Sequence, residues 1–145
     1  MILNWDVALV QFVNEVRGSC WVWGRTDCAC IARRALTVIH GRDVWDGVIG
    51  HWTTAEGAIR VLNSIRNPEM ALQQSGGYSV SPRWQRAGDL VLGAQVGHDR
   101  MPQIGIIIPS GQVMLSSKED GVYVLRHYSM LKEDSTYWRW GDHVE

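Results

Sequence analysis

The sequence predicts an α+β fold in which helices come first and a small antiparallel sheet follows. Apolar residues recur with helical spacing in the first half of the chain. Short runs rich in β-branched residues, separated by turn residues, occupy the second half. The chain has 145 residues, of which 46% are hydrophobic. We therefore expect residues 1–145 to form a single domain whose helices pack on the sheet.

Two helices are predicted near the start of the chain. The first spans about Trp5 to Val16, where apolar residues fall on one stripe. The second is the clearest element, because apolar residues from Cys28 to Ile39 follow the i, i+3, i+4, i+7 pattern. Thr26 or Asp27 can cap its start, and Gly41 stands where a helix stops.

A third helix and four strands are predicted after these. The helix begins near Thr53, which has capping-box spacing to Glu56, and Asn67-Pro68 ends it. The stretch 73–82 is expected to be a loop. The chain then changes to short β-rich runs that predict an antiparallel meander. These runs are GDLVLG (88–93), QIGIII (103–108), QVMLSS (112–117) and GVYVLRHY (121–128).

Composition argues against several classes of function. With 14 basic and 15 acidic residues, the net charge is −1, so the chain has no basic surplus to hold nucleic acid. It also lacks a glycine pattern that would cradle a phosphate, so no nucleotide or other cofactor is expected. The 8 tryptophans favour packing in the core and at its rim, with a protein interface as the alternative.

The sequence predicts a protein that is made and folded in a reducing cytoplasm. The start of the chain lacks the basic residues and the cleavage site of a signal peptide. No apolar run approaches the ~20 residues that span a bilayer. The 3 cysteines cannot all pair with one another, so no disulfide framework is expected.

Cys28 and Cys30 stand two apart on the predicted helix and should point about 200° apart. Cys28 shares its side with Ile31 and Ala32, so it should face inward. A helix start favours an anion and can lower the pKa of a thiol, which makes Cys28 a candidate nucleophile. A small buried apolar residue is an equally open interpretation. Cys30 should face outward or toward a neighbouring element.

A metal site is a weaker alternative for the cysteines. Cys20, Cys28 and Cys30 could supply three ligands, with a histidine as the fourth. Their C-x7-C-x-C spacing is not that of a zinc knuckle, and the helix splays the last two apart. We therefore expect no metal.

Four motifs together resemble the NlpC-type cysteine peptidases, a papain-like family that cuts peptidoglycan stem peptides. WGRTDCACIARRAL resembles the family's nucleophile turn and helix, and AGDLVLG its GDLVFF strand. PQIGIIIPSGQVML is similar to its HVGIYIG hairpin. GVYVLRHYSMLKEDSTYWRW is similar to its last strand and closing tryptophan segment. The similarity runs from Trp23 to Trp140 and implies the papain-like NlpC fold. The WGRTDC opening is typical of short relatives encoded among the tail-tip genes of tailed phages.

The resemblance implies a mechanism that this chain cannot complete in the usual way. Cys28 matches the nucleophile. The position of the family's catalytic histidine falls on Gln103, and the third polar position falls on Leu115. A Gln amide does not titrate near neutral pH and Leu has no polar group, so neither can act as or orient a base. By the same matching, Trp23, Asp27 and Gly105 fall at binding positions.

A relocated histidine could restore the chemistry. His98 lies five residues before Gln103, and Asp99 or Asp89 could orient it. His127, on the last predicted strand, is a weaker candidate because the family uses no residue there.

Three functions follow from this resemblance. The first is a phage tail-tip structural or assembly protein, located in the virion, whose partners are other tail proteins and whose peptidase fold is catalytically degenerate. The second is an active peptidoglycan endopeptidase or amidase that uses Cys28 with His98. The third is a module that binds stem peptides or acyl chains without cutting them.

Overall fold

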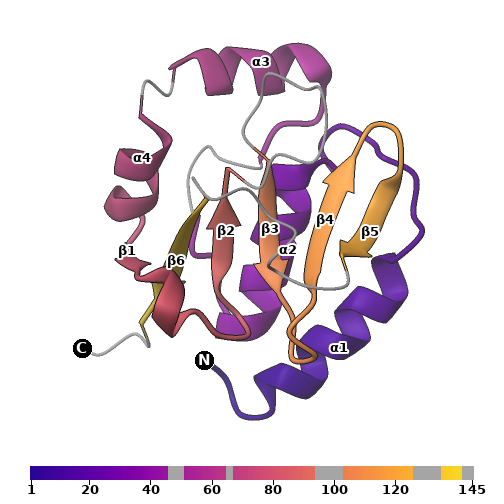
Figure 1. The fold of residues 1–145 in the computed structure, drawn as a ribbon. Coiled ribbons are helices and arrows are strands. Elements are labelled where there is room, and N and C mark those ends of the chain that lie inside the picture. Colours follow the sequence, from indigo (N-terminus) through magenta and orange to yellow (C-terminus); the bar gives the residue numbers. More distant parts are fainter. Residues whose placement is uncertain (46–50, 65–66, 94–102, 126–134, 142–145) are drawn as a thin grey trace.

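A computed structural model describes residues 1–45, 51–64, 67–93, 103–125 and 135–141 (Figure 1). Over these residues the chain forms 4 α-helices and one 6-stranded antiparallel sheet in the order β1-β6-β2-β3-β4-β5, which confirms the α+β class. The helices are α1 (Trp5–Val16), α2 (Cys28–His40), α3 (Ala55–Ser64) and α4 (Pro68–Gln74). The strands are β1 (Gly77–Val80), β2 (Leu90–Leu92), β3 (Ile104–Ile107), β4 (Val113–Ser117), β5 (Gly121–Leu125) and β6 (Thr136–Trp140).

The first two helices begin and end where the sequence predicts. Asp27 caps α2, because its side chain accepts a hydrogen bond from the Cys30 N–H. Gly41 ends α2 in the left-handed conformation, with φ of 68°, which glycine adopts without strain. In Figure 1, α2 runs behind the central strands, and α1 packs against α2.

The region between α2 and the meander differs from the prediction. The cap of α3 is Thr54 rather than Thr53, since the Thr54 hydroxyl accepts from the Gly57 N–H at 3.0 Å. Asn67-Pro68, expected to end a helix, opens α4. Proline suits the first helical position because it has no N–H to satisfy, and Asn67 caps the Met70 N–H. The predicted loop 73–82 contains the end of α4 and all of β1, which forms by pairing with β6.

The four predicted strands are present as β2, β3, β4 and β5 and form a meander. The first three are slightly shorter than their apolar runs, and residues 126–128 of the last run lie outside the described residues. β6 lies between β1 and β2, which extends the sheet beyond the meander. One face of the sheet shares a core with α1 and α2, where Leu36, Ile106 and Trp138 are buried. The other face carries a second apolar cluster of Val91, Ile107, Val113, Leu115 and Tyr137.

Half of the 8 tryptophans are buried, and three more are partly buried, which agrees with packing in the core and at its rim. Trp45, Trp52, Trp138 and Trp140 are buried, whereas Trp84 is 71% exposed. Among the helices of the described ranges, none combines the length and apolar character needed to cross a bilayer.

Candidate functional site

The turn that precedes α2 is organised by the carboxylate of Asp27, which is only 1% exposed. Its Oδ1 accepts from the Cys30 N–H at 3.0 Å. Its Oδ2 accepts from the Gly24 N–H at 2.7 Å and from the indole N–H of Trp52 at 2.9 Å. Asp27, which the family resemblance placed at a binding position, therefore holds the turn together and ties it to Trp52.

The same turn is wedged between the ends of β3 and β4. The paired residues of these strands are Ile106 with Met114 and Ile107 with Val113. In that register the next hydrogen-bonding pair would be Ile104 with Ser116.

These two residues contact the turn instead, one through its backbone and one through its side chain. The Ile104 N–H faces the Cys28 thiol, and the buried Ser116 hydroxyl donates to the Thr26 carbonyl. Cys28 therefore lies where the two strands separate.

Cys28 is half-buried and its thiol is held neutral. Burial, followed by the negative charge of Asp27, raises the pKa of the Cys28 thiol to about 11, although the N–H groups of Ile104 and Ala29 work in the other direction. We expected the helix start to lower this pKa. That expectation is wrong because desolvation and the neighbouring carboxylate outweigh the favourable amide groups.

Cys30 is the more buried of the two cysteines, with 1% of its surface exposed. It packs with Ala29, Trp52 and Ala58, so of the two orientations expected, the one toward a neighbouring element is confirmed. Burial and the hydrogen bond to Asp27 raise the pKa of the Cys30 thiol far above its ordinary value. Cys20 is exposed. Across the described ranges, no three His, Cys, Asp or Glu side chains gather as metal ligands would.

Gln103 lies directly before β3 and is buried. Its backbone carbonyl accepts from the Gly93 N–H at 2.9 Å, and the next residue, Ile104, faces Cys28. The structure therefore brings the position that matches the family histidine to the neighbourhood of the nucleophile position. The side chain at that position is the amide of Gln103, where the family has an imidazole.

Leu115 and Gly105 are joined by packing on the face of the sheet away from α1 and α2. A Cβ atom added to Gly105 would lie 2.7 Å from Leu115 Cδ2 and 2.8 Å from Val113 Cγ1. Glycine is needed here because the side chains of β4 cover its backbone. Gly105, predicted at a binding position, thus has a packing role, and Leu115 belongs to the second apolar cluster.

The residues proposed for a relocated base are only partly described. His98, Asp99 and His127 lie outside the described residues. Asp89 is buried and pairs with Arg139 through two contacts, Nε to Oδ1 at 2.7 Å and a terminal guanidinium nitrogen to Oδ2 at 2.8 Å. Asp89 is therefore engaged by an arginine and is not available to orient a histidine.

Trp23 lies at the edge of the site. Its ring meets that of Trp21 edge-on, with centroids 4.3 Å apart. The Lys118 ammonium lies 5.4 Å from the centroid of each ring. A cation over an aromatic face is stabilising, so these contacts fix Trp23 beside the turn.

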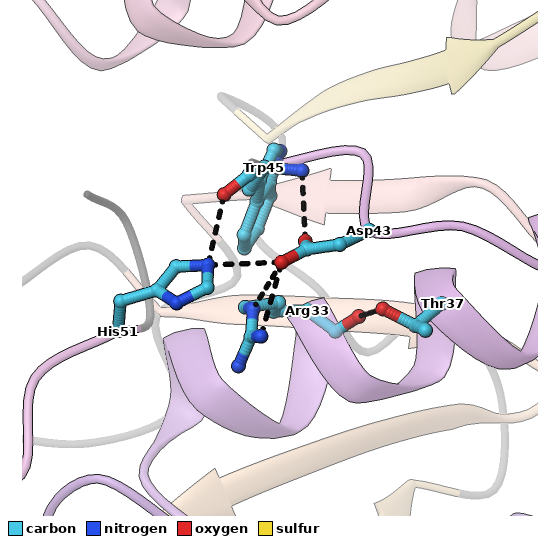
Figure 2. A network of polar contacts seen from close by, with 5 residues as sticks. All are labelled: Arg33, Thr37, Asp43, Trp45 and His51. Carbon is cyan, nitrogen blue, oxygen red and sulfur yellow. Dashed lines mark hydrogen bonds and ion pairs between the residues drawn. The ribbon is translucent and has the colours of Figure 1, made fainter. Parts of the chain in front are cut away.

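A second polar cluster was not predicted from the sequence. Figure 2 shows Arg33 and His51 converging on Asp43, whose Oδ2 lies 3.0 Å from Arg33 Nε and 2.9 Å from His51 Nε2. His51 Nε2 also lies 3.1 Å from the Trp45 carbonyl. Because both neighbours of Nε2 are acceptors, this nitrogen carries a proton.

The carboxyl of Asp43 is stabilised in its charged form. Burial would raise its pKa, but hydrogen bonds from Arg33 and from the Trp45 N–H outweigh burial and lower the pKa below its ordinary value. The spacing of residues 33, 43 and 51 along the sequence does not match a motif, so no signal in the sequence indicated this cluster. Only the return of the chain toward α2 brings them together.

Fold and site together define an α+β domain with a cysteine at the start of a helix that is wedged into the end of a sheet. The chain belongs to the family described as Domain of unknown function (DUF6950), whose model matches residues 2–133. Among curated proteins, none matches the chain.

Proposed function

We propose that this chain is a papain-like, NlpC-type domain that has lost its catalysis and serves as a structural or assembly protein in a bacteriophage tail tip. The observation that carries the loss of catalysis is the environment of Cys28. Its thiol has a pKa raised to about 11, and the position that matches the family's histidine holds Gln103. The papain-like assignment is supported by the order of the four motifs and by the place of Cys28 between β3 and β4.

The chemistry of amide cleavage explains why we expect the environment of Cys28 to be catalytically inactive. A cysteine peptidase needs a thiolate and a base that later protonates the leaving amine. The histidines of the described ranges do not supply that base. His40 ends α2 at the opposite end from Cys28, and His51 is engaged with Asp43. Groups that act together lose most of their effect when one is missing, so we expect no residual turnover.

The tail-tip role rests on the resemblance of the WGRTDC opening to short tailed-phage relatives. In this proposal the protein is made in the cytoplasm of the host bacterium, is carried in the virion and contacts other tail proteins. Exposed apolar side chains such as Leu3, 89% exposed, and Trp84, 71% exposed, offer surface for such contacts. Cross-linking of assembled particles, read by mass spectrometry, should join reactive side chains near these residues to other tail proteins. A particle that lacks the chain would contradict the role.

The first experiment is alkylation of Cys28 across pH, read by peptide mass spectrometry. We expect Cys28 to react only as the pH rises well past the ~8.5 of a free thiol, with the exposed Cys20 in the same molecule reacting earlier. Purified muropeptides should not be cleaved. A reactive plateau below pH 7, together with hydrolysis that Cys28→Ala abolishes, would overturn the proposal.

An active peptidoglycan endopeptidase or amidase is the second candidate. It is favoured by the amide groups at the thiol, since the N–H groups of Ile104, Ala29 and Cys28 all stabilise the thiolate. In this candidate His98 serves as the base. Loss of hydrolysis in both Cys28→Ala and His98→Ala would support it, whereas hydrolysis that survives His98→Ala would remove His98 from the mechanism.

A further inference from the structure

Residues His51–Thr53 lie directly across the turn that starts α2. A Cβ atom added to Gly24 would lie 2.6 Å from the Trp52 carbonyl oxygen and 2.8 Å from Thr53 Cα. These distances are too short for any side chain, so the two backbones touch at Gly24. The backbone of residues 51–53 therefore packs directly against the backbone of the turn.

Trp52 fastens this segment from the inside. Its indole N–H donates to Asp27 Oδ2 at 2.9 Å, and the side chain is buried. With Ala58 it covers Ala29 and Cys30. The indole thus helps to bury Cys30.

His51 fastens the same segment from the outside. Its Nε2 donates to Asp43, which lies just beyond the end of α2 and is also held by Arg33 (Figure 2). The side chains of His51 and Asp43 are 35% and 23% exposed, so this contact breaks more easily than the buried one. Asp27 and Asp43 flank the two ends of α2, and the segment is therefore tied to both.

We propose that His51–Thr53 is a strap that closes over Cys30 and the first turn of α2, and that it opens as a unit when its two carboxylate fastenings are released. Opening would expose the Cys30 thiol and release Asp27 Oδ2 from the Trp52 indole N–H. The proposal concerns access to this end of α2, and it holds whether or not Cys28 is catalytic.

The test measures how fast iodoacetamide labels Cys30 in the folded chain at constant pH, relative to Cys20 in the same molecule. The variant Trp52→Phe keeps the aromatic ring but removes the indole N–H. We expect it to raise the relative labelling rate of Cys30 by about tenfold, as loss of a buried hydrogen bond predicts. His51→Ala, at a half-exposed site, should raise the rate by about threefold. His51→Gln should restore most of the protection because its amide can donate to the same two acceptors.

Trp140→Phe is the matched control. Trp140 is also buried, and its indole N–H donates to the Ser75 hydroxyl at 3.1 Å, away from the strap. This control should leave the relative labelling of Cys30 in the absence of denaturant unchanged. Equal rates in Trp52→Phe and wild type, or an equal increase in Trp140→Phe, would overturn the strap, since protection would then reflect global unfolding.

Discussion

Each end of α2 is flanked by a carboxylate, and the two carboxylates are stabilised in opposite ways. Before the first residue, buried Asp27 accepts hydrogen bonds from two backbone N–H groups and from the indole of Trp52. Beyond the last residue, partly exposed Asp43 meets the charged side chain of Arg33 and the ring of His51. Neutral donors hold the carboxylate before α2, and side chains that can carry charge hold the carboxylate after it.

This difference between Asp27 and Asp43 predicts which of the two carboxylates fixes the geometry of the site. Donors that belong to the backbone are already ordered, and burial shields them from water and salt. Long side chains at the surface lose conformational entropy when they pair, and salt screens their attraction. The position of Cys28 should therefore depend on Asp27 far more than on Asp43.

The largest expected effect comes from removing the buried carboxylate. Asp27→Ala deletes the cap of α2 and leaves the Gly24 N–H and the Trp52 indole without an acceptor. Loss of a cap costs about 1 kcal/mol, and stranded buried donors raise the total to about 3 kcal/mol. Denaturant unfolding should show this loss in the free energy of unfolding.

The control for this variant is Asp6→Ala, an aspartate in the first turn of α1 with an exposed side chain. It should change stability by less than about 0.5 kcal/mol. Similar losses in the two variants would mean that the Asp27 hydrogen bonds contribute no more than surface charge, and the contrast between the ends of α2 would fail.

A smaller effect is expected where the turn meets the sheet. Ser116→Ala removes the hydroxyl that donates to the Thr26 carbonyl, next to the point where the β3–β4 pairing ends. The buried carbonyl is then unsatisfied, which costs about 1–2 kcal/mol. Ser110→Ala is the matched control, because its hydroxyl bonds Gln112 at the exposed end of the hairpin and should contribute almost nothing. Equal midpoints of thermal unfolding for the two variants would remove Ser116 as an anchor of the site.

The elements that could be predicted from the sequence are those whose signals lie in neighbouring residues. The apolar stripes of α1 and α2 lie within each helix, and the caps of α2 stand directly beside it, so these helices follow from nearby residues. The formation of β1 depends on β6 at the other end of the chain, and no nearby residue indicates that pairing. A loop was therefore predicted where a strand forms.

In the candidate site, too, features set by neighbouring residues could be predicted, and features set by distant residues could not. The place of Cys28 at a helix start could be predicted, because it follows from helical spacing and a cap. The raised pKa of its thiol could not, because that pKa depends on how deeply the sheet and Asp27 enclose it. The contacts of Asp27 with Trp52 and of Asp43 with His51 join distant positions, and only the folded path of residues 51–53 brings them together.

The smallest expected effect on stability comes from the partly exposed Asp43, and this effect also depends on pH. The pKa of Asp43 is lowered below its ordinary value of 3.8, so the folded state favours the charged carboxylate. Its contribution to stability is therefore present above about pH 4 and is lost as the pH falls through the lowered pKa. Asp43→Asn should cost less than about 1 kcal/mol at pH 7, and the cost should shrink as the pH falls through the lowered pKa. Salt at about 1 M should shrink the cost at pH 7, because screening acts on this partly exposed cluster. If instead Asp43→Asn cost as much as Asp27→Ala and did not respond to salt, the contrast between the two carboxylates would fail, and the His51 contact would be as stable as that of Trp52.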